Sequence, residues 1–183
     1  MGSGKSTVSE IIQNAGFAVF SCDKIYKELL SRGVFDVDLM NAFGGGIFVE
    51  GKLDKAKLSD KVFNDRQALE KLNEITHPVI MKEALNCIKD EKIGFIEVPL
   101  LFENGFEKFF DKVLVVLRNR DIRIDSIVKR DKITQNEAIL RLKAQYDYDN
   151  SDFTKYYVIH NDGNFNDLSI SVGTVLKKIT ENF

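Results

Sequence analysis

The sequence predicts an α/β fold with a doubly wound parallel sheet, because short apolar runs alternate along the chain with segments of helical periodicity. The runs cover residues 17–20, 93–98, 113–117 and 156–159, and their length and β-prone composition favour strands buried on both faces. Alternation of such strands with helices is typical of a parallel sheet. The chain of 183 residues fits a single domain that carries a smaller inserted part.

The composition argues against a protein that binds nucleic acids or membranes. The formal net charge is −2, and acidic and basic residues are spread along the whole length, so no large surface of one sign is available. No apolar run approaches the roughly 20 residues that cross a bilayer. We therefore expect a globular protein with no nucleic-acid partner and no membrane partner.

The cysteines and histidines give no support for a zinc site or a disulfide. Cys22 and Cys87 lack metal-ligand spacing, and His77 and His160 lie far apart in the chain. Because no signal peptide precedes them, the cysteines are expected to be reduced thiols. These observations predict a cytoplasmic protein.

The chain begins with the second half of a Walker A phosphate-binding motif, MGSGKST. Apolar residues at helical spacing follow, and Gly16 stands where a left-handed C-terminal cap is needed. Glycines let backbone N–H groups surround phosphate oxygens, and the helix N-terminus adds its own free N–H groups. Lys5 would neutralise the β- and γ-phosphates of a nucleotide, and the Ser6 hydroxyl would hold a bridging Mg²⁺. The predicted phosphate-binding residues are Gly2, Ser3, Gly4, Lys5, Ser6 and Thr7.

The motif is incomplete at its start. Its first glycine would stand ahead of Met1, and the strand that normally leads into the loop is also absent. We therefore expect that the natural polypeptide begins upstream and that Met1 is an internal residue. Two alternatives remain: a Gly/Ser-rich terminus of no function, which the following helix disfavours, and a natural start in a nucleotide-binding module without catalysis.

Residues 54–91 predict an inserted helical subdomain. They contain no strand-like run, and their apolar residues suit helices packed against each other. Asp54 is the expected N-cap of the first helix. The His77-Pro78 step should end one helix and open the next with proline in its first turn.

Residues 121–147 predict a helix–turn–helix lid. The second helix should begin at a capping box from Thr134 to Glu137 and continue through Arg141 and Gln145. Arg141 and Gln145 would then share one face and point toward the same nucleotide, although a solvated charged face is the more common explanation of an isolated Arg–Gln pair. Arg130, at the end of the first helix, could close on the transferring phosphate.

Asp23 is the candidate general base. It directly follows the strand at 17–20, at the carboxyl edge of the sheet, where α/β folds bind their ligands. A carboxylate near a magnesium-bound phosphate can accept the proton of an attacking hydroxyl. The alternative is an N-cap for a helix at 25–30, and local sequence does not separate the two.

Other polar residues follow the later strands. Glu97 and Glu103, on either side of a Pro-Leu-Leu-Phe run, could reach a magnesium-bound water or a substrate hydroxyl, but this run also suits buried loop packing. His77 suits either a helix-end hydrogen bond or a catalytic role. The segment 161–163 is either a turn or a loop that contacts a base.

In their order along the chain, these segments resemble the dephospho-coenzyme A kinase family. The phosphate loop alone is shared by many families, whereas the ordered set of His-Pro, Pro-Leu-Leu-Phe-Glu and Arg-Leu-x-Ala-Gln is far more discriminating. The resemblance extends over nearly the whole chain. It rests on Gly2 to Thr7, Asp23, Phe43-Gly44, Gly51-Lys52-Leu53-Asp54, His77-Pro78, Pro99 to Glu103, Arg130-Asp131, Arg141 with Gln145, and Asn161 with Gly163.

The resemblance implies a P-loop core with a helical coenzyme-binding subdomain and a lid. It implies that ATP, with Mg²⁺, phosphorylates the ribose 3′-hydroxyl of dephospho-coenzyme A in the last step of coenzyme A synthesis. Its implied catalytic residues are Lys5, Asp23 and Arg130. Beyond the phosphate loop, it implies nucleotide contacts from Arg141 and Asn161 and substrate contacts from His77, Pro99, Leu101 and Glu103.

Some positions depart from the family pattern. Ser21 replaces a frequent acidic residue, Glu97 replaces aspartate, and Ser126 stands where an arginine is common. Lys155-Tyr156 replaces a common Ala-Asp pair before the last strand. Another small P-loop kinase, for a nucleoside or a nucleotide, would share the ATP site and differ in the helical insert. We expect a monomer or a small homo-oligomer.

Overall fold

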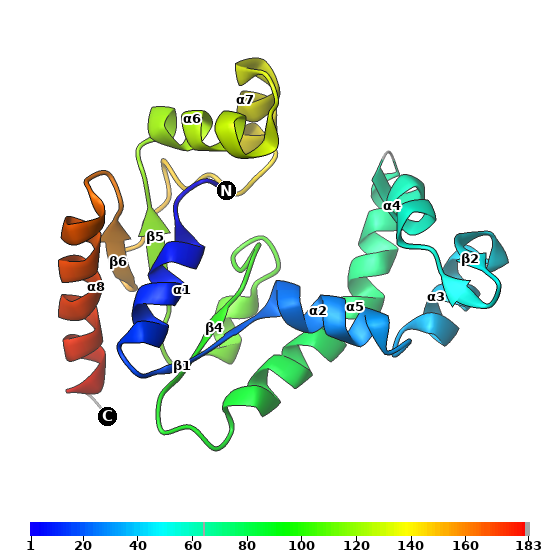
Figure 1. Ribbon diagram of the computed structural model, residues 1–183, viewed down its shortest axis with the longest axis horizontal. Helices are drawn as coiled ribbons and strands as arrows, with labels where there is room; N and C mark the ends of the chain where they lie inside the picture. The colour runs from blue at the N-terminus through cyan, green and yellow to red at the C-terminus, as the bar shows by residue number, and fades with distance from the viewer. Residues whose placement is uncertain (64, 182–183) are drawn as a thin grey trace. The chain divides into compact units, whose positions relative to one another are not determined.

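A computed structural model describes residues 1–63 and 65–181 of the chain. Contacts divide the chain into two compact units (Figure 1). The phosphate-loop unit comprises residues 1–19 and the chain from 97 onward, and the helical unit comprises residues 20–96. None of the described helices is long and apolar enough to cross a membrane.

The phosphate-loop unit contains a parallel strand pair covered by helices (Figure 1). Strands β5 and β6 pair in parallel, with Val115 opposite Val158, and α8 packs against both β6 and α1. Helices α6 and α7 pack against each other. The elements of this unit are α1 (Lys5–Asn14), η2 (Phe106–Phe109), β5 (Leu114–Leu117), α6 (Arg120–Asp131), α7 (Gln135–Lys143), β6 (Tyr157–His160) and α8 (Phe165–Thr180).

Helix α8 illustrates how the sequence specifies these elements. Asn164 caps its N-terminus by accepting hydrogen bonds from the N–H groups of Asn166 and Asp167. Leu168, Val172 and Leu176 recur every fourth residue and are buried, so one stripe of the helix faces the core.

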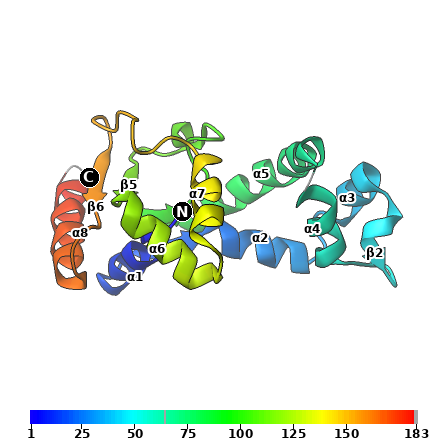
Figure 2. The ribbon, with the colours of Figure 1, turned by 90° about the horizontal axis from the view of Figure 1, so that it is seen from above.

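The helical unit is built around the long helix α5. Helices α2, α3 and α4 pack against α5, and Figure 2 shows α4, α3 and β2 gathered at one end of this unit. Phe35, Leu39 and Ala84 are almost completely buried. The elements of this unit are α2 (Cys22–Ser31), α3 (Asp36–Phe43), η1 (Gly45–Ile47), β2 (Phe48–Val49), β3 (Lys52–Leu53), α4 (Lys55–Phe63) and α5 (Arg66–Ile88).

The expected strands lie within a residue or so of the apolar runs, but they are less buried than predicted. Strands β1 (Ala18–Ser21) and β4 (Gly94–Glu97) form one pair, and β2 pairs with β3 antiparallel. In β5 and β6 only Val115 and Ile159 are buried. Each described strand has one paired neighbour, so fewer side chains flank it than would flank a central strand of a wider sheet.

Two local predictions are confirmed and one is wrong. Asp54 caps α4 through the N–H groups of residues 56 and 57, and Gly16 has a φ of 95° after the end of α1. By contrast, α5 does not break at His77-Pro78 but continues through Pro78. Proline costs one helical hydrogen bond, yet buried residues on both sides of it, from Leu72 to Ala84, hold the helix together.

The start of α2 removes the alternative interpretation of Asp23. Helix α2 begins at Cys22, with Ser21 as its N-cap residue, and Asp23 lies in its first turn. Asp23 is therefore not the N-cap, because the helix starts earlier than the expected 25–30.

Candidate active site

The phosphate loop forms a turn of glycines at the start of α1. Gly2 and Gly4 have φ values of 74° and 87°, a left-handed region that favours glycine. Lys5 is the first helical residue, and no side chain caps the helix N-terminus. The free N–H groups of α1 and the positive end of its helix dipole therefore remain available to bind an anion.

Residues far along the chain fix this loop in place. The Asn161 side chain donates a hydrogen bond to the Ser3 carbonyl at 2.8 Å, and both residues are buried. A Cβ at Gly4 would lie 2.3 Å from Nδ2 of Asn161, and one at Gly2 would lie 2.9 Å from the Arg123 carbonyl. Only glycine fits at either position, so the loop packs directly on α6 and on the segment after β6.

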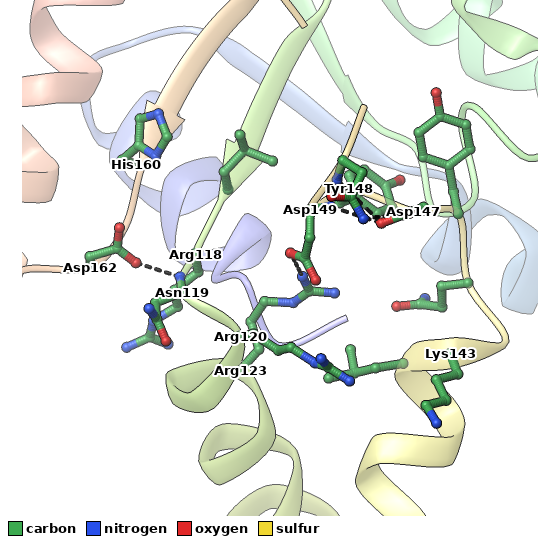
Figure 3. A pocket seen from close by; sticks show the side chains of 15 residues that line it. Arg118, Asn119, Arg120, Arg123, Lys143, Asp147, Tyr148, Asp149, His160 and Asp162 are labelled. Atoms are coloured by element: carbon green, nitrogen blue, oxygen red, sulfur yellow. Dashed lines mark hydrogen bonds and ion pairs between the residues drawn. The ribbon is translucent and has the colours of Figure 1, made fainter. Parts of the chain in front are cut away.

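The same unit contains a pocket of about 750 Å³ (Figure 3), and two of its lining residues, Arg123 and Gln145, form hydrogen bonds with Met1 at the start of the loop. Its walls come from the carboxyl ends of β5 and β6, from α6, and from the end of α7 with the segment that follows it. Asn161, which holds the loop, directly precedes the pocket residue Asp162. The lining residues are Leu117, Arg118, Asn119, Arg120, Arg123, Leu142, Lys143, Gln145, Tyr146, Asp147, Tyr148, Asp149, Asn150, His160 and Asp162.

The carboxylates of the pocket already accept hydrogen bonds from other groups of the protein. Asp149 accepts from Nη1 of the buried Arg123 at 2.9 Å, and Asp162 accepts from the backbone N–H of Asn119 (Figure 3). Hydrogen bonds from Asn150 hold the pKa of Asp147 below its usual range. These three negative charges are therefore satisfied by the protein.

Three of the pocket cations, Arg118, Arg120 and Lys143, have no carboxylate partner among the described residues. Among the ion pairs of this part of the chain, the pocket contributes only the one between Arg123 and Asp149. Because the carboxylates are satisfied and these cations are not, the pocket favours a ligand that is rich in negative charge and hydrogen-bond acceptors.

The two predicted lid helices meet at an arginine–aspartate cluster. Arg130 donates from Nε and Nη2 to Asp131, and Arg141 donates from Nη1 to the same carboxylate at 2.8 Å. The hydrogen bond between Arg130 and Asp131 raises the pKa of Arg130 and lowers the pKa of Asp131. The expected capping box, Thr134 with Glu137, is confirmed. Phosphate contacts from Arg130 and Arg141 stay predictions.

The predicted pairing of Arg141 with Gln145 on one helix face is wrong. Helix α7 ends at Lys143, so Gln145 lies beyond it, and its Oε1 accepts from the Met1 amino group at 2.8 Å. Arg141 instead forms an ion pair with Asp131, which lies at the end of the neighbouring helix α6.

The Pro99–Glu103 loop joins an aromatic cluster that sequence reasoning did not find. Half-buried Pro99 and Leu101 lie in this loop, and Glu103 accepts a hydrogen bond from the Tyr146 N–H at 3.1 Å. Burial, followed by the charge of Glu103, raises the pKa of Tyr148 to about 12. The aromatic cluster consists of Phe102, Tyr146, Tyr148, Phe153 and Tyr156, whose ring centroids lie 5.3–6.4 Å apart in the contacting pairs.

The remaining predicted site residues occupy defined local positions. Glu97 accepts from the Ser9 hydroxyl at 3.0 Å, at the end of β4. Asp23 is exposed in the first turn of α2, and His77 lies in α5, where burial lowers its pKa. Asp23 and His77 belong to the helical unit and Lys5 to the phosphate-loop unit, so their joint role stays a prediction.

A family model described as dephospho-CoA kinase matches residues 1–167. The chain belongs to the dephospho-CoA kinase family. Curated dephospho-CoA kinases support the assignment. The protein from Fusobacterium nucleatum is 36% identical over 92% of this chain and 89% of its own length. The protein from Listeria innocua is 31% identical over 100% of this chain and 94% of its own.

Solved structures confirm the predicted fold class, a P-loop α/β fold with a parallel sheet. A Thermus thermophilus crystal structure superposes with a TM-score of 0.80 at 27% identity, covering 97% of this chain and 93% of that chain. Dephospho-CoA kinase from Campylobacter jejuni gives a TM-score of 0.71 at 29% identity, with coverages of 100% and 94%. Membership in a kinase family identifies ATP as the expected nucleotide.

In this dephospho-CoA kinase family member, sequence reasoning missed much of the pocket wall. Arg118, Arg123, Tyr146 and Tyr148 all line it. One signal was present, because Arg118-Asn119-Arg120 directly follows a strand, at the sheet edge where ligands bind. The tyrosines gave no signal, since a loop after a helix has no periodicity that predicts its direction.

Proposed function

We propose that this chain transfers the γ-phosphate of ATP to the ribose 3′-hydroxyl of dephospho-coenzyme A, giving coenzyme A and ADP in the last step of coenzyme A synthesis. The observation that carries the proposal is the buried Asn161–Ser3 contact, which fixes a glycine loop at a helix N-terminus beside a pocket with unpaired cations. The family match over residues 1–167 supports the choice of acceptor.

Phosphoryl transfer needs little from the protein beyond positioning and charge neutralisation. The free N–H groups at the start of α1 would surround the phosphate oxygens, and the Lys5 ammonium would neutralise the charge on the β- and γ-phosphates. Arg130 would add a second positive charge once it leaves Asp131. These groups act on the oxygens where negative charge develops in the transition state.

Ser6 is the residue that would hold magnesium. Its hydroxyl is exposed in the first turn of α1, directly beside the loop, and hydroxyl and phosphate oxygens are ligands that Mg²⁺ prefers. No cluster of three His, Cys, Asp or Glu side chains suited to a metal occurs within the described residues, which fits an ion carried mainly by nucleotide phosphates. Bound Mg²⁺ would neutralise phosphate charge.

Asp23 would accept the proton of the acceptor hydroxyl. It is an exposed carboxylate in the first turn of α2, two residues after the end of β1. His77, Pro99, Leu101 and Glu103 would contact dephospho-coenzyme A. We also propose a cytoplasmic location. The chain is proposed to be a monomer or a small homo-oligomer, and light scattering on the purified chain would test this oligomeric state.

The deciding experiment measures ADP release with Mg²⁺ and ATP, comparing dephospho-coenzyme A with adenosine and common nucleotides as acceptors. We expect turnover with dephospho-coenzyme A alone. Turnover with a nucleoside or nucleotide alone would favour another small P-loop kinase. ATP binding without turnover on any acceptor would favour a non-catalytic module.

Two variants assign the roles. Asp23→Asn should nearly abolish turnover and leave ATP binding intact, whereas Asp38→Asn, an exposed aspartate in α3 of the same unit, should retain activity. Lys5→Met should weaken both ATP binding and turnover, the latter by about 100- to 1,000-fold. Unchanged turnover in Asp23→Asn would remove that residue from the role of base.

A further inference from the structure

Arg118 occupies an unusual position at the end of β5. It directly follows Leu117, lines the pocket, and donates from Nη1 to the Ser126 hydroxyl of α6 at 3.2 Å. The Ser126 hydroxyl itself donates to the Ile122 carbonyl at 2.8 Å. Because its proton is used in this way, the oxygen lone pairs face the guanidinium and fix its orientation.

The protein satisfies little of the hydrogen-bonding capacity of Arg118. Its Nε atom is buried and has no partner among the described residues, and no carboxylate pairs with the guanidinium in the same part of the chain. A buried N–H without a partner destabilises the folded state, so a guanidinium kept in this condition calls for a functional explanation.

Two other arginines near the site differ in this respect, whereas Arg120, which also lines the pocket without an ion pair in the described residues, is exposed to solvent. Arg123 donates from Nε to the Met1 carbonyl and from Nη1 to Asp149, so it serves the architecture of the loop and the pocket. Arg130 is bound to Asp131 through two nitrogens. Arg118 has more donors left for a ligand than Arg123 or Arg130.

The backbone around Arg118 is also tied to the phosphate loop. The N–H of the next residue, Asn119, donates to Asp162. The residue before Asp162 is Asn161, which holds the Ser3 carbonyl. Two hydrogen bonds thus link the strand end that carries Arg118 to the loop that would receive the nucleotide phosphates.

We propose that Arg118 is a nucleotide-binding residue, and that Ser126 positions its guanidinium in the pocket beside the phosphate loop. The contact is a charge-assisted hydrogen bond to an acceptor of the bound nucleotide, from either its phosphate chain or its nucleoside end. The inference rests on the proposed use of ATP, but it does not depend on the acceptor.

The test is calorimetric titration of the intact chain with ATP. Arg118→Gln should raise the Kd by about 10- to 100-fold. Ser126→Ala should raise it by about threefold, because the guanidinium stays but loses its orientation. The matched control, Lys129→Gln, removes an exposed positive charge from α6 and should leave the Kd within about twofold.

An exchange variant separates a ligand contact from a packing role. Ser126→Arg alone places a second guanidinium against the first and should weaken ATP binding. Arg118→Ser combined with Ser126→Arg restores one guanidinium and one hydroxyl, so this double variant should recover much of the affinity.

Melting temperatures give a second readout. The melting temperature of Arg118→Gln without ATP should not fall, since an unpaired buried N–H is removed. The rise in melting temperature that ATP induces should be smaller in this variant than in the wild type.

Titrations with adenosine and with magnesium tripolyphosphate identify the contact. A loss confined to adenosine binding assigns Arg118 to the nucleoside end, and a loss confined to tripolyphosphate assigns it to the phosphate chain. Wild-type ATP affinity in Arg118→Gln overturns the inference and leaves the proposed function intact. ATP binding that depends on Arg118 in a chain that does not phosphorylate dephospho-coenzyme A supports the inference and overturns the proposed function.

Discussion

The two units of this chain depend on different kinds of contact. In the phosphate-loop unit, side-chain hydrogen bonds join distant residues, as between Asn161 and Ser3 or Arg123 and Asp149. In the helical unit, Asp65 and Thr76 bond to backbone groups within four residues, and the centre is apolar, with Leu39 fully buried. Polar substitutions should therefore damage the site, and cavities should damage the stability of the helical unit.

The largest expected effect is on stability, in the helical unit. Leu39→Ala should lower the free energy of unfolding by about 2–5 kcal/mol, because Leu39 is 0% exposed and its loss leaves a cavity. Val37→Ala in the same helix, at a side chain that is 73% exposed, should change it by less than about 0.5 kcal/mol. Urea unfolding measures both.

The comparison also predicts what Leu39→Ala leaves unchanged. While the variant is folded, its Kd for ATP should equal that of the wild type, because the phosphate loop belongs to the other unit. If the Kd for ATP instead rose in proportion to the lost stability, ATP binding would depend on the packing of the helical unit, and the two units could not be treated as separate in function.

The next effect falls on the phosphate loop. Asn161→Ala removes the donor to the buried Ser3 carbonyl, which should cost about 1–3 kcal/mol of stability and raise the Kd for ATP by about tenfold. Asn166→Ala is the matched control, because Asn166 is exposed and only its backbone N–H, which alanine keeps, donates to Oδ1 of Asn164. Unfolding and ATP titration of both variants check this, and an unchanged Kd in Asn161→Ala would contradict it.

A smaller effect concerns the start of α7. Thr134→Ala destroys the capping box and should destabilise the chain by about 1 kcal/mol. Thr174→Ala, in the middle of α8, removes only a hydroxyl that bonds to the carbonyl four residues back, so it should be neutral or slightly stabilising. Equal melting temperatures for the two variants would argue against a role for the cap.

The smallest effect is a dependence of stability on pH. Burial lowers the pKa of His77 below its ordinary value of 6.5, so below that pH the unfolded state binds more protons than the folded state. The free energy of unfolding should therefore fall slightly as the pH drops from about 7.5 to about 5.5, and His77→Gln should reduce this slope. Urea unfolding across this range measures the effect, and identical slopes would refute it.

Features set by neighbouring residues could be predicted from the sequence. Asp54 and Thr134 cap helices through backbone groups two or three residues away, and the left-handed Gly16 ends α1. The phosphate loop was predictable for the same reason, because the glycines, the lysine and the following helix form one continuous segment.

Features set by distant contacts could not be predicted. The helix around Pro78 continues because buried residues on both sides of it are packed, and no local signal gives that packing. Arg141 turns to Asp131 for a similar reason. The pocket wall at 145–150 depends on the aromatic cluster, whose members come from two separate parts of the chain.

The aromatic cluster also gives the protein an optical property. The chain contains no tryptophan and five tyrosines, three of which, Tyr146, Tyr148 and Tyr156, belong to this cluster. Tyr146 and Tyr148 also line the pocket. Two of the five tyrosines that give the unlabelled protein its ultraviolet emission therefore lie beside the candidate nucleotide site, and a change in their emission would report on the filling of that site in real time.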